Sequence, residues 1–314
     1  MARYIVKRLL LMIPILLGVS LIVFCITASN TAPIIMHIGG ESLSPEEYAK
    51  IEHELGFDRP ILIRYVEYMS NMLRGDLGRS HMRNQDVWEV FVGALPLTLK
   101  LSFWSVVVSI AISIPLGIIS ALKNGTVIDN GSMVVALLGL ATPNFWLGLM
   151  LIILFSLKLG WFPSGGARNG IMSFILPAIT VGTGMTASLT RQTRSSMLDV
   201  LRADYLRTAR AKGVPEHRVI LYHAMRNALI PIITVIGGQV AACLAGAALT
   251  ETVFALPGVG RVIVNAVSEA DIFMVTGCVT MKAIITASIM LLVDLLYAFV
   301  DPRIKAQYAK GGKK

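Results

Sequence analysis

The sequence predicts an all-α integral membrane protein with six transmembrane helices. Apolar residues make up 55% of the 314 positions and charged residues only 15%, whereas ordinary soluble domains carry about 25% charged residues. A helix that crosses the hydrocarbon core needs about 20 mostly apolar residues. Stretches of this kind occupy residues 9–28, 94–122, 132–157, 174–189, 229–249 and 274–300.

Two of these stretches need an argument of their own. The first follows Arg3, Lys7 and Arg8, as a cleaved signal sequence would, but its roughly 20 apolar residues exceed a usual signal core of about 7 to 15. An uncleaved helix is therefore favoured. The fourth, residues 174–189, is short and rich in small polar residues. It is kept because leaving it out would put the two termini on opposite sides of the membrane.

The distribution of charge predicts the orientation. Segments assigned to the inside carry 17 basic and 5 acidic residues, in residues 1–8, 123–130, 191–228 and 301–314. Segments assigned to the outside carry 9 basic and 13 acidic residues, in residues 29–93, 158–172 and 251–273. Because basic residues favour the cytoplasmic side, both termini are expected in the cytoplasm. The net charge of +9 then reflects topology, and no nucleic-acid partner is expected.

The chain is expected to divide into four parts: an N-terminal transmembrane helix (1–28), an outer helical segment (29–93), a transmembrane core (94–300) and a basic cytoplasmic tail (301–314). Within the outer segment, Ser44, Pro45 and Glu47 form a capping box that predicts a helix start. A second helix is predicted over residues 60–73, ended by Gly75. These two helices predict a small folded cap.

The inner loop 191–228 is too long and too regularly patterned for a simple turn. Apolar and amphipathic residues recur at helical spacing, at Leu198, Leu201, Tyr205, Thr208 and Lys212. Gly213 and Pro215 should end that helix, and a second one should begin near Glu216. Such a hairpin fits either a docking element for a partner protein or an amphipathic element on anionic lipid. The residues alone favour the two equally.

A resemblance favours docking. Residues 204–213, Asp-Tyr-Leu-Arg-Thr-Ala-Arg-Ala-Lys-Gly, and the following stretch to Pro231 resemble the EAA loop of ABC-importer permeases, in the version of the dipeptide, oligopeptide and nickel branch. Of the general Glu-Ala-Ala pattern, the last alanine and the glycine match, at Ala209 and Gly213. Blocks at residues 55–60, 75–80, 142–146, 251–261 and 301–303 resemble the same branch, in family order.

The resemblance implies a type I ABC-importer permease fold and a subunit that forms half of the translocation path for di- or oligopeptides. Implied partners are a second homologous permease, one or two ABC ATPase subunits, an outer substrate-binding protein and the lipid bilayer. The location implied is the cytoplasmic (inner) membrane of a bacterium or archaeon. Nickel or a metal chelate is the alternative cargo. Because the chain has no Gly-x4-Gly-Lys-Ser/Thr loop, ATP and Mg²⁺ are expected on the partner ATPase. No catalytic residue, cofactor or metal site is expected on this chain.

The resemblance and the residue chemistry together select candidate site residues. ATPase coupling is expected to involve Asp204, Tyr205, Arg207, Ala209, Gly213, Glu216 and Arg218. Ala209 would permit close approach, Gly213 would permit the turn, and Arg207 would pair either with an acidic groove or with a lipid headgroup. The translocation path is expected near Gln239 and Asn144. The outer loop motif consists of Glu251, Pro257, Gly258 and Gly260.

Two other classes of function remain as alternatives. A self-sufficient secondary transporter would need ionisable residues near the membrane midplane, and Asp294 is the one residue that approaches this description. A membrane-embedded enzyme would need a paired-aspartate, Ser-His or His-Glu-x-x-His arrangement within the spans, which the sequence lacks. Lys100 and Lys282 are expected to extend their amines toward the nearer interface. The importer permease is favoured over both alternatives.

Overall fold

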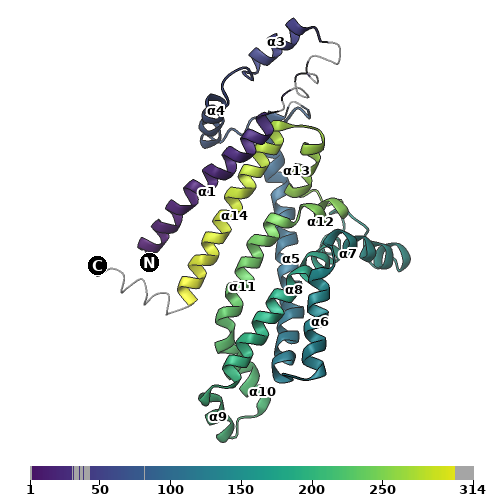
Figure 1. The fold of residues 1–314 in the computed structure, drawn as a ribbon. Helices are drawn as coiled ribbons and strands as arrows, with labels where there is room; N and C mark the ends of the chain where they lie inside the picture. The colour runs from purple at the N-terminus through teal and green to yellow at the C-terminus, as the bar shows by residue number, and fades with distance from the viewer. Residues whose placement is uncertain are drawn as a thin grey trace.

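Residues 2–29, 31, 35, 38, 43–80 and 82–300 are described by the structure, a computed structural model (Figure 1). The described part is mostly helical. Its helices that are long and apolar enough to cross a membrane are Arg8–Ala28, Val87–Leu122, Met172–Leu201, Glu216–Gly246 and Ile272–Leu296. A sixth span is added if the bent pair Val127–Ala141 and Asn144–Lys158 is counted as one. The predicted basic tail, residues 301–314, lies outside the described residues.

The long helices form an elongated bundle. Helix α1 (Ala2–Ala28) lies along α14 (Ile272–Val300), as Figure 1 shows. Helices α5 (Val87–Leu122) and α8 (Met172–Leu201) make the most extensive helix pair, and α6 (Val127–Ala141) and α11 (Met225–Gly246) pack on α8. Glycine permits the close approach of α5 to α8: a Cβ on Gly117 would lie 2.5 Å from the Thr193 side chain.

The third apolar stretch is broken and not continuous. Helix α6 ends at Ala141, and α7 (Asn144–Leu151), extended by the π-helix η1 (Ile152–Lys158), leaves at 97° to it. Pro143 explains the break, because it lacks a backbone N–H and disfavours the helical conformation at the residue before it. Thr142 is accordingly extended, with φ −78° and ψ 123°. The arm that starts at α7 projects sideways from the bundle (Figure 1).

The outer segment contains the predicted helices. Helix α3 (Pro45–Glu54) begins with the complete capping box between Ser44 and Glu47, which confirms that prediction. Helix α4 (Ile61–Leu73) follows, and Gly75, at φ 88°, turns the chain after it. A short hairpin of β1 (Arg79–Ser80) and β2 (Gln85–Asp86) was not predicted.

Helix α5 begins at Val87 and not at the expected residue 94. The cause is a side-chain cap: the Asp86 carboxylate accepts hydrogen bonds from the backbone N–H groups of Trp88 and Glu89, at 2.8 and 3.2 Å. Hydropathy does not detect such a side-chain cap, and Glu89 lowers the hydropathy of the first turn.

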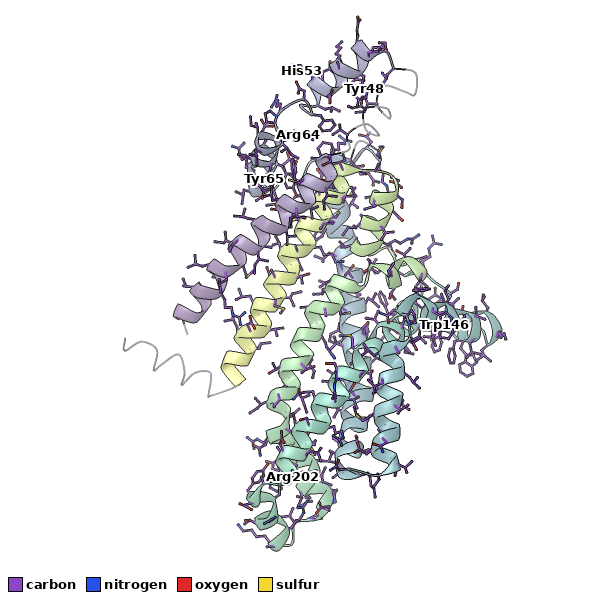
Figure 2. All side chains as sticks on the ribbon, in the orientation of Figure 1. Tyr48, His53, Arg64, Tyr65, Trp146 and Arg202 are labelled. Carbon is purple, nitrogen blue, oxygen red and sulfur yellow. The ribbon has the colours of Figure 1, made fainter. Side chains whose placement is uncertain are left out.

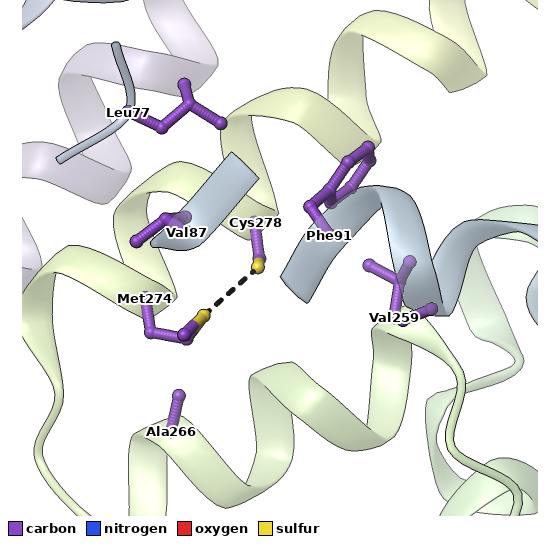
Figure 3. Packing of buried hydrophobic residues seen from close by; sticks show 8 residues of the cluster. Leu77, Val87, Phe91, Val259, Ala266, Met274 and Cys278 are labelled. Carbon is purple, nitrogen blue, oxygen red and sulfur yellow. Dashed lines mark hydrogen bonds between the residues drawn. The ribbon is translucent and has the colours of Figure 1, made fainter. Parts of the chain in front are cut away.

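The end of α5 nearest the outer segment packs against α13 (Val259–Ser268) and α14. Figure 3 shows this core, in which Cys278 donates to the Met274 thioether at 3.6 Å. Its buried members are Leu77, Val87, Phe91, Ala94, Val259, Ala266, Met274 and Cys278. Because these residues come from the outer segment, α5, α13 and α14, the core joins the outer segment to the bundle.

In the inner loop the first predicted helix is broken in two, whereas the second begins at Glu216 as predicted and continues to Gly246. Leu198 and Leu201 belong to α8, and the chain breaks at Ala203, which is extended with ψ 141°. Helix α9 (Asp204–Ala211) is therefore separate from Leu198 and Leu201, and the predicted single helix through residues 198–212 is wrong. After Gly213 come α10 (Glu216–Arg218) and the π-helix η2 (Val219–Ala224), which leads into α11. Figure 1 places α9 and α10 at the end of the bundle opposite α3 and α4.

Candidate functional site

The candidate coupling residues 204–218 form one compact unit, called here the basic hairpin because it contains four basic and two acidic residues. Gly213 adopts φ +76°, and a Cβ there would meet nothing within 4 Å, so glycine is needed for the backbone conformation and not for space. Arg210 closes the turn with two hydrogen bonds to Glu216, Nε to Oε2 at 3.1 Å and Nη2 to Oε1 at 2.8 Å. Glu216 was a candidate, whereas Arg210 was missed.

An apolar root fixes the basic hairpin to the bundle. Leu206 from α9 and Val219 from η2 are both fully buried. They share a cluster with residues of α5, α8, η2 and α11, namely Ala121, Leu189, Met197, Ala224, Ala228 and Ile232. Ala209 is half-buried against the same cluster, so part of its small surface is used within the chain. The hairpin is therefore a packed extension of the bundle and not a free loop.

The exposed side of the basic hairpin is polar. The side chains of Asp204 and Arg207 are 94% and 79% exposed and form an ion pair at 3.7 Å, a separation and exposure that contribute little to stability. Arg218 is exposed as well. Arg202, at the junction with α8, lies at the hairpin end of the molecule, opposite Arg64 and Tyr65 of α4 (Figure 2). The charged side chains of this surface face solvent and contribute little to the stability of the fold.

Tyr205 is itself exposed, but its hydroxyl reaches the bundle. Its hydroxyl donates to the His223 carbonyl at 3.4 Å and accepts from the Asn227 amide at 2.8 Å. Of the coupling candidates, Tyr205 and Ala209 thus contact the bundle, Gly213 and Glu216 shape the turn, and Asp204, Arg207 and Arg218 face outward.

The two candidates for the translocation path approach neighbouring residues of α8, Gln239 at Met185 and Asn144 at Gly184. Gln239 in α11 is 8% exposed; its amide nitrogen donates to the Met185 carbonyl at 2.8 Å, and its oxygen accepts from Ser109 at 3.4 Å. In this conformation Gln239 therefore joins α11 to α8 and α5. Asn144 is exposed at the start of α7. Its Oδ1 atom lies close to Gly184, where an added Cβ would come within 3.0 Å of it. That either residue faces a water-filled path stays a prediction.

The outer loop motif centres on a buried carboxylate. Glu251, in α12 (Ala248–Val253), is 1% exposed. Its Oε1 accepts from the Thr98 hydroxyl at 2.7 Å and its Oε2 from the Arg261 backbone N–H at 3.0 Å. The Thr98 oxygen in turn accepts from the Val259 N–H at 2.9 Å. Together these groups satisfy backbone donors in the first turn of α13, where negative charge is favoured.

The glycines of this motif make room for the Glu251 carboxylate. A Cβ on Gly258 would lie 2.5 Å from both carboxylate oxygens, and one on Gly260 would lie 2.5 Å from the Ala248 Cα. Pro257 is exposed just before them. Burial raises the pKa of the Glu251 carboxyl, while its hydrogen bonds act in the opposite direction. The motif is therefore an internal clasp between α5, α12 and α13.

Several charged residues within the bundle helices have partners in the chain. Asp294 of α14 pairs with Arg8 of α1 at 2.8 Å. The Lys282 amine donates to the Ala245 carbonyl at 3.2 Å, at the end of α11. A further pair, Asp129 with Arg194, was missed. Asp129 is the one acidic residue of the short loop 123–130. A search for its basic partner could have found the pair, because a buried charge needs a partner.

Comparison with protein families decides the identity. The model described as binding-protein-dependent transport system inner membrane component matches residues 113–306, and the model for the N-terminal part of such membrane components matches residues 1–102. The chain belongs to this family. The permease therefore contains, within the matched region, both the basic hairpin and the Glu251 clasp. The resemblance seen in the sequence blocks is confirmed at the level of an ABC-importer permease.

Curated relatives match the permease over nearly its whole length. The di/tripeptide transport system permease protein of Pseudomonas aeruginosa (strain UCBPP-PA14) is 39% identical, covering 98% of this chain and 100% of its own. The dipeptide transport system permease protein of Escherichia coli (strain K12) is 39% identical, covering 97% and 99%. The oligopeptide transport system permease protein of Bacillus subtilis (strain 168) is 38% identical, covering 97% and 100%.

Solved structures support the fold. An inward-facing structure of the methionine ABC transporter MetNI aligns with a TM-score of 0.57 at 14% identity, covering 68% of the permease and 96% of that chain. An amino acid ABC transporter with histidines aligns with a TM-score of 0.51 at 16% identity, covering 68% and 94%. At this level of identity the likeness establishes the architecture alone.

Proposed function

We propose that the permease is one half of the membrane channel of an ATP-driven importer of short peptides, paired with a second, homologous permease. Support for the cargo comes from relatives that are 38–39% identical over almost the full chain and whose names specify di/tripeptide, dipeptide or oligopeptide transport. A nickel or metal-chelate cargo is the alternative to be separated by experiment. The binding protein that gives the family its name would deliver the cargo at the outer face.

The coupling role is supported by the way the basic hairpin combines a buried root with an exposed charged surface. Leu206 and Val219 are fully buried in the bundle, while Asp204, Arg207 and Arg218 remain exposed. A rigidly rooted element with a charged free surface can transmit a rigid-body movement from a partner to the spans, which a flexible loop cannot do. We therefore infer that a separate ATPase subunit, which would hold ATP and Mg²⁺, docks on this surface.

The topology that this role requires is six spans with both termini in the cytoplasm. Counting α6, α7 and η1 as one broken span gives an even number of crossings. The excess of basic over acidic residues in residues 191–228, eight against three, supports the placement of the basic hairpin inside. The cytoplasmic membrane of a bacterium or archaeon is the location that this arrangement and the relatives favour.

The first test is to isolate the permease with its partners from mild detergent and identify them by mass spectrometry. We expect an ATPase, a second permease and an outer binding protein that is stabilised thermally by short peptides. Stabilisation by nickel chelates in place of peptides would reassign the cargo. Recovery of the permease alone or as a homo-oligomer, in repeated gentle preparations, would contradict the proposal.

The second test addresses coupling directly. Gly213→Pro and Ala209→Arg alter the basic hairpin and leave the spans unchanged, so we expect normal membrane insertion but loss of ATP-dependent uptake. Gly160→Pro is the matched control, because Gly160 also has a positive φ, +65°, and open space around it but lies in the loop after η1. Uptake in both hairpin variants equal to that of the control would remove the coupling assignment.

A further inference from the structure

We propose that Tyr205, Asn227 and the carbonyl group of His223 form a positioning link that carries movement of the basic hairpin into α11. The inference rests on the proposed function, because it assumes an ATPase that moves the hairpin. It adds His223 and Asn227 to the coupling candidates, and it predicts how a bound ATPase changes the membrane helices.

The link is a closed triangle of hydrogen bonds. The Asn227 amide nitrogen donates both to the Tyr205 hydroxyl, at 2.8 Å, and to the His223 carbonyl, at 3.2 Å. The Tyr205 hydroxyl donates to the same carbonyl at 3.4 Å. Tyr205 lies in the first turn of α9, His223 in η2 and Asn227 in the first turn of α11. Three elements close in sequence, with only α10 between α9 and η2, therefore meet at one point.

The element in the middle of the triangle is a π-helix. In η2 (Val219–Ala224) the backbone follows the i to i+5 pattern, which is rare and occurs mostly as single turns at functional sites. A π-turn and an α-turn of the same residues differ in the angle at which the following helix leaves. The His223 carbonyl, which accepts hydrogen bonds from Tyr205 and Asn227, lies in η2. A change of η2 from a π-turn to an α-turn would rotate α11 relative to the basic hairpin.

The other contact between hairpin and bundle is of a different kind. Leu206 and Val219 anchor the hairpin by apolar packing, which resists separation but allows sliding, because dispersion and hydrophobic contacts are not directional. Hydrogen bonds weaken steeply when their angle changes. The triangle can therefore fix the orientation of α9 relative to α11, while the apolar root fixes its distance.

Exposure makes the link separable from folding. Tyr205 is 42% exposed, and Asn227 is exposed as well. Removing one hydroxyl or one amide at such positions leaves no buried polar group unsatisfied, so the fold should be retained. A loss of transport in these variants would then report on coupling and not on assembly.

The experiment uses the complete importer complex reconstituted in liposomes, with ATP hydrolysis and peptide uptake measured in the same vesicles. For Tyr205→Phe and for Asn227→Ala we expect the ATPase to remain bound and to hydrolyse ATP. Uptake per ATP hydrolysed should fall about fivefold or more, the lower end of typical coupling effects. The double variant should fall no further than either single one, because both remove the same link.

Tyr222→Phe is the matched control. Tyr222 is 61% exposed on η2 itself, and its hydroxyl makes no hydrogen bond within the described part of the chain. This variant should keep the unaltered ratio of uptake to hydrolysis. A Tyr205→Phe ratio equal to that of Tyr222→Phe would overturn the link.

Three further outcomes also decide against the link, in distinguishable ways. If the Tyr205→Phe complex loses the ATPase and the unaltered complex keeps it, the hydroxyl serves docking and not transmission. Absence of an ATPase from the unaltered complex would overturn the proposed function, and the link with it. Strictly additive losses in the double variant would show that Tyr205 and Asn227 act separately.

Discussion

Asp129 on α6 accepts two hydrogen bonds of 2.7 Å from Arg194 on α8. The carboxylate also accepts from the Ser120 hydroxyl and, at 2.9 Å, from the Gly125 N–H, so its acceptor sites are well used. Arg194 reaches Asn124 as well, at 2.7 Å. The pair therefore ties α5, α6 and α8 together at the end of the bundle that carries the basic hairpin.

Asp129→Ala should destabilise the permease strongly. The Asp129 side chain is only 3% exposed and that of Arg194 28%, and breaking a buried pair costs roughly 3 to 5 kcal/mol because one charge is left without a partner. Thermal unfolding in detergent measures the effect as a lowered Tm. Glu67→Ala is the matched control, since Glu67 and its partner Arg59 are about half exposed, at 51% and 53%, and such pairs contribute at most about 1 kcal/mol. Equal shifts in Tm for both variants would contradict the assignment.

Gly258→Ala should destabilise the outer end of the bundle, because its Cβ would lie 2.5 Å from the Glu251 carboxylate oxygens. Adding Glu251→Ala removes the obstacle, so the double variant should be less destabilised than the sum of the two single ones. Gly238→Ala in α11, where a Cβ meets nothing within 4 Å, should be neutral or slightly stabilising. Melting temperatures of the four variants provide the measurement, and strict additivity would disprove the clasp.

Lowering the pH should weaken the attachment of the β1–β2 hairpin to the α13–α14 turn. Arg83 donates two hydrogen bonds of 2.6 Å to Glu269, and these hold the pKa of that carboxyl below its ordinary value of 4.5. Because the folded-state pKa is depressed, the contact stabilises the fold above about pH 4.5 and is lost as the pH falls through the folded-state pKa. The difference in Tm between the unaltered permease and Glu269→Gln should therefore be constant near neutral pH and vanish in acid. A difference that grows on acidification would have the wrong sign.

Leu206→Ala should loosen the basic hairpin without unfolding the bundle. Leu206 is fully buried, and large-to-small changes at such sites cost about 2 to 5 kcal/mol. Most of that cost should fall locally, because α9 has only eight residues. Hydrogen exchange should accelerate in residues 204–218, whereas Leu221→Ala, at a side chain 64% exposed, should leave the exchange unchanged. Unaltered exchange in Leu206→Ala would show that the hairpin is held by other contacts.

The basic hairpin shows how far sequence reasoning reached. Gly213 and Pro215 predicted the turn, because only certain residues fit a left-handed or a non-helical backbone, and the turn is present. The break at Ala203 was not predicted, since a helix-compatible pattern continued through it and no glycine or proline marks it. The partner of Glu216 was missed because Arg210 precedes it across the turn, where neither helical nor strand spacing applies.

The outer motif shows the same limit. Its glycines belong to the sequence block at residues 251–261. Glycine is needed there because the Glu251 carboxylate lies against the first turn of α13 and leaves no room for a Cβ. Thr98 completes this site from a position 153 residues away in sequence. Periodicity along the chain carries no information about such a contact.

The sequence by itself determined the membrane class, most helix locations and the permease family. The signals for them act over a few neighbouring positions: apolar length, positive charge in the loops, capping residues and turn residues. Only the tertiary structure decided the 97° break between α6 and α7, the pairing of Asp129 with Arg194 and the Tyr205–His223–Asn227 triangle. The physical reason is that polar groups in a low-dielectric interior must find partners wherever the packed helices place them, and packing joins residues that the chain keeps apart.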